Sequence, residues 1–247
     1  SFKLYADDLK LYSSVRLNES SAVASGLEKL DQWSRIWQLK INSGKCSVIH
    51  LGSQNHCEQY HLGTSLLPNV DSVCDLGVTY SNRLSFENHI DKVVTKAYQR
   101  IYLIFRSFTS RKQELLKRAY TTYVRPTLEY CTQVWSPHLV KDIVRIEGVQ
   151  RYFTRRLFSK DSLTYDERLI LLDLEYLELR RLKYDLIMYF RIIKGLINLD
   201  REHFFIFLTS KHDTRSHPFQ LQKQIFPNNS MNNTFSNRAI ECWNSLP

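Results

Sequence analysis

Apolar residues alternate with polar ones at the start of the chain, and later they recur at helical spacing. In SFKLYADDLKLYSS, near-alternating apolar positions flank the pair Asp7-Asp8, which predicts two short strands joined by a tight turn at 6–8. Residues 20–39 place apolar side chains three or four apart, which predicts an amphipathic helix. The stretches 45–52 and 70–81 predict further strands, with a loop or weak hairpin between them.

The rest of the chain is helical in pattern. Apolar residues with a period near 3.6 predict helices over 86–108, 115–124 and 139–157, followed by a short and then a long helix within 165–196. Pro126 is expected to interrupt or kink the second of these helices. Aromatic residues on these stripes, such as Phe105, Tyr123 and Phe153, are expected in the core rather than as base-stacking platforms. After Asn198 the sequence becomes polar and irregular.

Charge is concentrated in one region of the chain. The net charge is +9, yet residues 92–160 contain fifteen Lys and Arg against four Asp and Glu, so this region carries more than the whole net charge. A regional excess of this kind is typical of a polyanion-binding surface. Solvated helix faces with incidental charge are the alternative interpretation.

Composition narrows the class of protein. A chain of 247 residues with 43% hydrophobic content is long enough to bury a core. We find no apolar run long enough to span a membrane and no signal-peptide pattern. Five cysteines without a paired framework favour reduced thiols, and therefore an intracellular protein, nuclear or cytoplasmic. Since a strand is predicted almost at Ser1, we expect a piece of a longer protein.

Seven sequence blocks stand in order along the chain. They are YADD at the predicted hairpin tip, LKINSGKCSVIHLG, DLGVTYSNRLSFENHI, YVRPTLEYCTQVWSP, IEGVQRYFTRR, YDERLILLDLEYLELRR and WNSLP. YADD resembles the catalytic signature of reverse transcriptases, which are RNA-directed DNA polymerases. The other blocks are similar to those of non-LTR (LINE-type) retrotransposons, with Ile41 replacing the second leucine of a Leu-x-Leu-Asn-x-x-Lys-Cys pattern. The resemblance covers nearly all 247 residues.

The resemblance implies an α+β organisation in three parts. Residues 1–84 would be a partial palm made of a hairpin, a helix and short strands. Residues 85–160 would be a helical thumb, and residues 161–247 a C-terminal helical region with an irregular tail. In the family, another catalytic aspartate and the fingers lie upstream of the YADD hairpin. We therefore expect a partial polymerase that is inactive alone and depends on the N-terminal fingers and palm of the same polyprotein.

The same resemblance assigns metal-binding and catalytic roles to Asp7 and Asp8. Nucleotide addition from dNTPs uses two Mg²⁺ ions, which prefer oxygen ligands. Neighbouring strand side chains point to opposite faces, so Asp7 is expected to face the ions and Asp8 to support it. An ordinary surface turn is the alternative, because aspartate is common in turns.

Three further residues receive roles near the primer and the nucleotide. Lys45 is expected to approach the triphosphate and act as a general acid, and a water-facing lysine at a strand edge is the alternative. Tyr5 would shape the floor under the primer terminus. Gly77 would mark a tight hairpin that approaches the primer backbone closely, or a plain turn glycine.

The basic helices are expected to bind the phosphates of an RNA template–DNA primer duplex. The candidate residues are Arg100, Arg106, Arg111, Lys112, Arg151, Arg155 and Arg156. A non-catalytic nucleic-acid-binding or interaction module derived from such an element is the second hypothesis, and a plain helical scaffold is the third. Zinc is disfavoured because the spacing of its usual ligand types matches no compact zinc pattern. These residues are Cys46, His50, His56, Cys57, His61 and Cys74.

Overall fold

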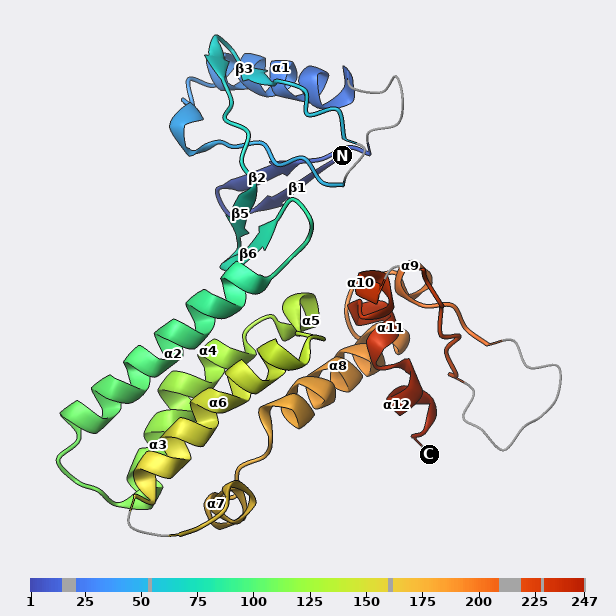
Figure 1. The fold of residues 1–247 in the computed structure, drawn as a ribbon. Coiled ribbons are helices and arrows are strands. Elements are labelled where there is room, and N and C mark those ends of the chain that lie inside the picture. The colour runs from blue at the N-terminus through green and yellow to red at the C-terminus, as the bar shows by residue number, and fades with distance from the viewer. Residues whose placement is uncertain (15–20, 53–54, 160–161, 209–218, 228, 247) are drawn as a thin grey trace. The chain divides into compact units, whose positions relative to one another are not determined.

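The chain folds as two compact units, Ser1–Asn88 and His89–Pro247. The computed structural model describes residues 1–14, 21–52, 55–159, 162–208, 219–227 and 229–246 (Figure 1). The first unit contains small antiparallel sheets and one long helix, and the second is mainly helical. This mixture agrees with the predicted α+β class.

The described part of the first unit contains three antiparallel hairpins, helix α1 and a short 3₁₀ turn. The hairpins pair β1 (Phe2–Tyr5) with β2 (Asp8–Leu11), β3 (His61–Leu62) with β4 (Ser65–Leu66), and β5 (Ser72–Asp75) with β6 (Val78–Ser81). Helix α1 (Ser21–Ile36) confirms the helix predicted over 20–39 and packs Leu27 against Tyr60, Leu62 and Leu67. The small core of this unit therefore lies between α1 and the β3–β4 hairpin.

Tight turns with positive φ define the two longer hairpins. Ala6 has φ 52°, and the β5–β6 turn combines Leu76 at φ 47° with Gly77 at φ 83°. Two successive positive φ angles are the pattern of a type I′ turn, which suits the twist of a hairpin. The β1–β2 hairpin is confirmed. The single strand predicted over 70–81 is wrong, because this turn divides it into two strands.

The strand predicted over 45–52 is also wrong. Lys45 ends a short 3₁₀ turn, η1 (Ser43–Lys45), where the Asn42 side chain accepts a hydrogen bond from the Gly44 N–H at 3.0 Å. Beyond it, Val48 forms an isolated parallel bridge with Asn69. The Val48 N–H donates to the carbonyl of Pro68 at 2.9 Å. Proline has no N–H to donate, which limits continuation of the ladder at this point.

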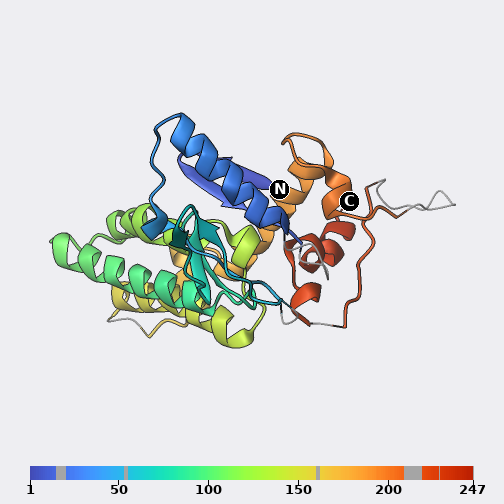
Figure 2. The same ribbon diagram turned by 90° about the horizontal axis from the view of Figure 1, so that it is seen from above.

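The second unit is built on two long parallel helices. Its helices are α2 (Glu87–Ser107), α3 (Gln113–Ala119), α4 (Arg125–Glu129), α5 (Thr132–Trp135), α6 (Val140–Leu157), α7 (Tyr165–Leu172), α8 (Leu177–Ile193), α9 (Arg201–Phe204), α10 (Asn229–Asn232), α11 (Phe235–Arg238) and α12 (Ile240–Asn244). Helices α2 and α6 lie side by side (Figures 1 and 2), with ring centroids 5.4 Å apart for Tyr98 and Tyr152. The helices predicted over 86–108, 139–157 and 165–196 are confirmed.

A π-helical turn, η2 (Tyr120–Val124), interrupts the second predicted helix just before Pro126. A π turn adds a residue to the helical repeat and so changes which side chains face the core. Tyr120 is fully buried, and its ring stacks on Phe153 at 4.3 Å. Tyr123 is 60% exposed, so its predicted core position is wrong. Phe105 and Phe153 are buried as predicted.

A buried hydrogen-bond network fixes α7 and α8 on α6. The Glu147 carboxylate accepts hydrogen bonds from the Tyr165 hydroxyl and from the Leu177 N–H, the latter at 2.9 Å. The Gln150 amide donates to the Tyr165 hydroxyl and accepts from the Tyr120 hydroxyl, both at 3.1 Å. Burial, and then the hydrogen bond to Glu147, raises the pKa of Tyr165. Hydrogen bonding makes these buried polar groups tolerable in the core.

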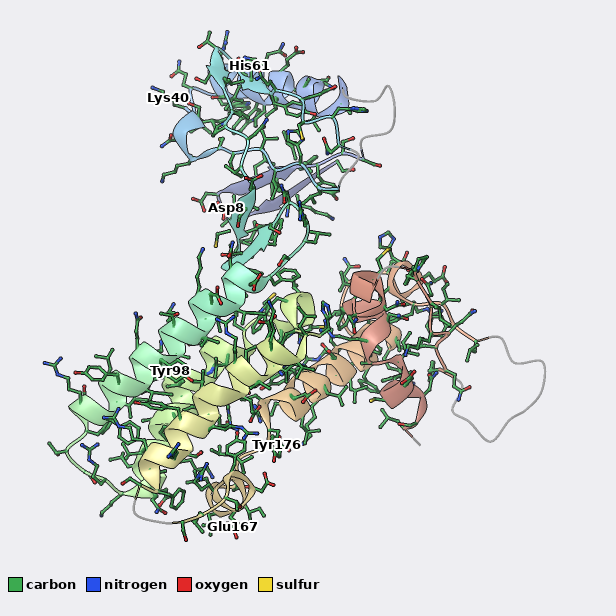
Figure 3. All side chains as sticks on the ribbon, in the orientation of Figure 1. Asp8, Lys40, His61, Tyr98, Glu167 and Tyr176 are labelled. Carbon is green, nitrogen blue, oxygen red and sulfur yellow. The ribbon has the colours of Figure 1, made fainter. Side chains whose placement is uncertain are left out.

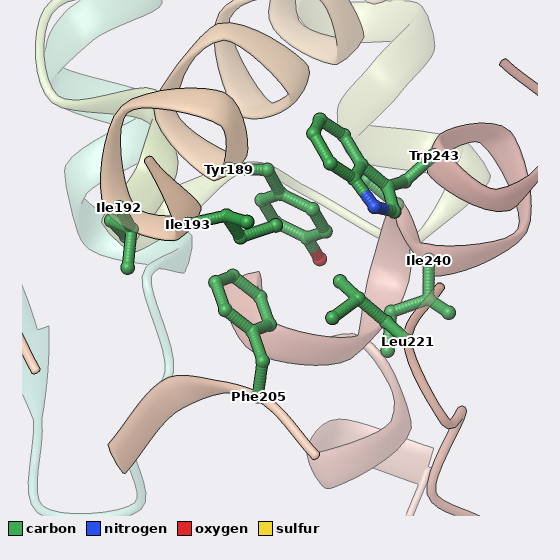
Figure 4. Close-up of a cluster of buried hydrophobic side chains, with 8 residues drawn as sticks. Tyr189, Ile192, Ile193, Phe205, Leu221, Ile240 and Trp243 are labelled. Carbon is green, nitrogen blue, oxygen red and sulfur yellow. The ribbon is translucent and has the colours of Figure 1, made fainter. Parts of the chain in front are cut away.

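The last helices pack on the end of α8. Figure 4 shows Tyr189 of α8 surrounded by Phe205, Leu221 and Trp243, all of which are buried. Arg238 of α11 forms a bidentate pair with Asp185 of α8 at 2.7 and 2.8 Å. Its guanidinium also donates to two backbone carbonyls of α5 at 3.1 Å. The C-terminal segment is therefore joined to both α5 and α8.

Three asparagines hold the extended segment 219–226 in place. Each side-chain amide makes two hydrogen bonds of 2.8–3.0 Å to the backbone of one residue: its oxygen accepts from the N–H and its nitrogen donates to the carbonyl. The three are Asn244, Asn237 and Asn232. The paired residues are Leu221, Gln224 and Phe226, respectively. These side chains copy the two-point pairing that a neighbouring strand would provide. The polar residues that led to the prediction of an irregular tail therefore hold residues 221–226 in a defined conformation.

His89 of α2 is buried against Trp135 of α5. The ring centroids are 4.9 Å apart at an interplanar angle of 70°. Burial, and then the nearby charge of Lys92, lowers the pKa of His89 below its usual value of 6.5. The folded protein therefore favours the neutral imidazole more strongly than the unfolded chain does.

We predict that replacing Glu147 strongly destabilises the helical unit. Glu147→Leu leaves the buried Tyr165 hydroxyl and Leu177 N–H without their acceptor, and each such group costs about 1–3 kcal/mol. The free energy of unfolding, measured by denaturant titration with far-UV circular dichroism, should fall by about 3 kcal/mol. The matched control Glu178→Leu alters an exposed position on α8. Equal losses in both variants would contradict the structural role of the network.

We also predict that His89 makes stability depend on pH. Because its pKa is lowered on folding, the unfolded chain binds the proton more readily, so stability should decline as the pH falls below about 6.5, by at most about 1.4 kcal/mol per pH unit. Thermal unfolding from about pH 7.5 to about pH 5.5 measures this loss. His89→Phe should flatten the profile, whereas the exposed-site control His138→Gln should not. An unchanged slope in His89→Phe would refute the assignment.

Candidate functional site

The Asp7-Asp8 pair lies at the exposed end of the first hairpin. Asp7 is the second turn residue, and Asp8 begins β2 opposite Tyr5 (Figure 3). All three side chains are exposed. The cross-strand register places Tyr5, Asp8 and Lys10 on one face of the hairpin, since side chains alternate along each strand. The structure thus brings Tyr5 and Asp8 together, and the turn presents Asp7 to solvent.

Lys10 joins this hairpin to the β5–β6 hairpin that contains Gly77. Its ammonium donates hydrogen bonds to the Asp75 carboxylate at 2.5 Å and to the Tyr80 hydroxyl at 3.1 Å. Partial burial acts to lower the pKa of Lys10, but the hydrogen bonds to Asp75 and Tyr80 outweigh it and raise that pKa. Asp75 directly precedes the Leu76-Gly77 turn, so the two candidate hairpins are neighbours within the first unit.

The carboxylates of the first unit fit magnesium in chemistry but not in number. Asp7 and Asp8 have the oxygen chemistry that Mg²⁺ prefers, and Asp75 is already paired with Lys10. Within the described residues, no three His, Cys, Asp or Glu side chains gather to hold a metal ion. The described carboxylates therefore do not form a complete magnesium site by themselves. The same finding applies to the cysteines and histidines considered for zinc, all of which are described.

Lys45 lies in a 3₁₀ turn and not, as the alternative interpretation expected, at the edge of a strand. Its side chain is exposed at the end of η1, and no described interaction links it to Asp7 or Asp8. Gly77 lies in the type I′ turn, where its positive φ is the local reason for glycine. The structure therefore explains Gly77 by backbone conformation.

Six of the seven basic candidates in the second unit are exposed. They are Arg106, Arg111, Lys112, Arg151, Arg155 and Arg156, and none is paired with a described carboxylate. Arg100 differs, because it is half-buried and donates to the Tyr123 carbonyl at 2.6 Å and to the Thr127 hydroxyl. Its guanidinium stabilises the π turn rather than standing free for a ligand.

Aromatic rings support the arginines at the C-terminal end of α6. The guanidinium of Arg156 lies 4.6 Å from the centroid of Phe105, and that of Arg111 lies 5.7 Å from the same ring. Arg151 and Arg168 lie 4.4 and 5.7 Å from the centroid of Tyr165. We call Arg111, Arg151, Arg155, Arg156 and Arg168 the arginine cluster. Sequence reasoning missed Arg168, which belongs to α7 and reaches the cluster only through the tertiary fold.

A hollow of about 640 Å³ opens within this cluster, between the end of α6 and the start of α7. Its lining includes Tyr152, Arg155, Arg156, Phe158 and Arg168, together with serine hydroxyls, and its described lining contains no acidic residue. A second hollow of about 650 Å³ adjoins it at Arg156 and includes Arg111. Concave surfaces of one charge concentrate the electrostatic field, which favours an anionic ligand.

Among the residues that the structure describes, none of the helices combines the length and apolar character needed to cross a membrane. Candidate functional residues are found in each unit separately. In the first unit they lie on the carboxylate-bearing hairpin tip, and in the second they form the arginine cluster.

Comparison with known proteins relates the chain to polymerases of mobile elements. No protein-family model matches the sequence, and no solved structure matches it. A Drosophila funebris protein named RNA-directed DNA polymerase from mobile element jockey is 25% identical over 159 residues, which are 62% of this chain and 17% of that protein. A Drosophila melanogaster protein named probable RNA-directed DNA polymerase from transposon BS is 29% identical over 163 residues, 62% of this chain and 18% of that protein.

A third relative has no named activity. It is an uncharacterized Caenorhabditis elegans protein that is 26% identical over 128 residues, 51% of this chain and 65% of that protein. The chain thus spans less than a fifth of each of the two Drosophila polymerases and less than two thirds of the C. elegans protein. Over about three fifths of its length, this chain is related in sequence, at low identity, to RNA-directed DNA polymerases of Drosophila mobile elements.

Proposed function

We propose that this chain is part of a retrotransposon RNA-directed DNA polymerase and holds the duplex of RNA template and DNA primer. The observation that carries the proposal is the set of exposed cations on the second unit that lack a described carboxylate partner. The printed names of the Drosophila relatives support the same class of activity. In this proposal, residues 85–160 act as the thumb.

Exposed, unpaired cations suit the phosphate backbone. Releasing the counterions condensed on nucleic acid drives such binding, and phosphate contacts give affinity without a choice of sequence. Arg106 and Lys112 extend the positive surface beyond the arginine cluster, at the end of α2 and just before α3. A polymerase must hold any sequence that it copies, so this form of recognition fits the proposed role.

The hairpin tip has a separate role in the proposal. Asp7 and Asp8 would hold Mg²⁺ in the complete enzyme together with a carboxylate from another segment, and the ions would neutralise charge on the dNTP phosphates. Tyr5, Lys45 and Gly77 retain the primer and nucleotide roles implied by the sequence resemblance. Because the described residues gather no third ligand, the chain alone would bind duplex without extending a primer.

A nucleic-acid-binding module without polymerase chemistry is the second candidate. The incomplete ligand set favours it, and the basic surface serves it equally well. The two candidates differ in whether Asp7 and Asp8 matter once the missing segment is supplied.

We predict that the chain binds an RNA–DNA duplex in a strongly salt-dependent manner. If about six cations contact phosphates, affinity should fall by roughly a thousandfold from about 50 to about 200 mM salt. Fluorescence anisotropy with a labelled blunt duplex measures this. The double variant Arg106→Ala, Lys112→Ala should reduce the slope of log affinity against log salt by about two, since each phosphate contact contributes about one.

A matched control uses a cation that is already neutralised. Lys183 of α8 is paired with Glu175, so Lys183→Ala should leave the salt slope unchanged. Duplex affinity that does not respond to salt, or an equal effect of the control, would argue against the proposed thumb surface.

We predict that the isolated chain does not extend a primer. Primer extension on an RNA template with Mg²⁺ and dNTPs should give no product above background, because the ligand set is incomplete. When the chain is joined to the fingers and palm segment of a related polymerase, extension should appear and be lost in Asp7→Asn. Extension by the chain alone would overturn the proposed dependence. Equal activity of the joined protein and its Asp7→Asn variant would favour the non-catalytic candidate.

A further inference from the structure

We propose that the hollow between α6 and α7 binds one unpaired nucleotide of a nucleic-acid strand. This inference rests on the proposed nucleic-acid-binding function and adds a second kind of contact to it. The exposed cations would contact the phosphates on the outside of a duplex. The hollow would bind a single nucleotide at a strand end or in an overhang.

The size of the hollow excludes a duplex. Its volume of about 640 Å³ falls within the range of about 300–1,000 Å³ that is typical of sites for small molecules. A base-paired duplex is much wider than such a site, but a single nucleotide is of small-molecule size. A nucleotide bound in the hollow would therefore have to be free of its partner strand.

The charges of the hollow fit the phosphate of that nucleotide. Arg155, Arg156 and Arg168 line it, and no described acidic residue does. Arg156 donates to the Tyr152 hydroxyl at 3.1 Å, and Arg168 donates to the Leu163 carbonyl at 2.5 Å. These bonds hold two guanidinium groups in position, so less side-chain freedom is lost when they bind phosphate. Arg155 is exposed and has no described carboxylate partner.

The aromatic lining fits the base. Tyr152 lines the hollow and is 42% exposed, so part of its ring is open to a ligand. Its ring is held edge to face against Tyr98, with centroids 5.4 Å apart. Stacking a base on an exposed aromatic face stabilises single-stranded nucleic acid without selecting a sequence. A simple phosphate or a phosphopeptide would leave this ring unused, whereas a nucleotide uses both the ring and the arginines.

The test compares two ligands on the full chain by fluorescence anisotropy. One is a blunt RNA–DNA duplex, and the other is the same duplex with a short single-stranded extension. The extension should increase affinity by about tenfold, as expected for a charge-assisted phosphate contact together with a stacked base. Arg155→Ala and Tyr152→Ala should each remove most of this gain. Tyr152→Phe should retain more of the gain than Tyr152→Ala, because the stacking face remains while Arg156 loses its hydrogen bond to the hydroxyl.

The matched control changes an exposed arginine outside the hollow. Arg106→Ala should weaken binding of both ligands to the same degree and leave the gain from the extension unchanged. Thermal unfolding midpoints of all variants identify any general loss of folding. Adding a nucleoside 5′-monophosphate should abolish the increase in affinity caused by the extension, whereas inorganic phosphate at equal ionic strength should not.

The outcomes separate this inference from the proposed function. Salt-dependent duplex binding with no gain from the extension overturns the nucleotide site and leaves the duplex proposal intact. A gain that depends on Arg155, with no binding of the blunt duplex, supports the site and overturns the duplex proposal. Equal competition by inorganic phosphate and the nucleotide would show a general anion site and overturn the inference.

Discussion

The helical unit depends on a carboxylate and an amide buried in α6. Glu147 and Gln150 are accepted in the core only because tyrosine hydroxyls and backbone groups from other elements complete their hydrogen bonds. The same bonds anchor Tyr165, whose ring face receives Arg151 and Arg168. The polar network therefore also positions two members of the arginine cluster, which links the stability of this unit to the shape of its candidate binding surface.

Two ways of handling positive charge distinguish the surfaces of this unit. Arg238 forms a partly buried bidentate pair with Asp185, and Arg180 pairs with Glu129, so these cations serve the fold. In the arginine cluster, aromatic rings take the place of carboxylates beside four of the five guanidinium groups, those of Arg111, Arg151, Arg156 and Arg168. A ring attracts a cation without cancelling its charge. Such cations remain available to phosphate, which is the physical basis of both the duplex and the nucleotide proposals.

The first unit exposes negative charge, whereas the arginine cluster of the second unit is positive. Asp7 and Asp8 are exposed at a hairpin end, where a polar side chain avoids the cost of burial, while Asp75 is paired with Lys10. An exposed pair of carboxylates attracts divalent cations but needs further oxygen ligands to hold them in defined geometry. In the proposed polymerase role, this exposure would leave the pair open to Mg²⁺ and to ligands from another segment.

Local patterns in the sequence determined the elements whose contacts are local. Helical periodicity identified α1, α2, α6 and the α7–α8 pair, and apolar alternation identified the first hairpin with its exposed aspartates, because these depend on neighbouring residues. Tertiary structure decided the rest. The π turn exposed Tyr123 and buried Tyr120, and Pro68 limited pairing at Val48. Arg168 joined the hollow from a separate helix, and three asparagines ordered a polar tail. These outcomes depend on specific hydrogen bonds and packing contacts, several of them between segments distant in sequence, which local periodicity does not record.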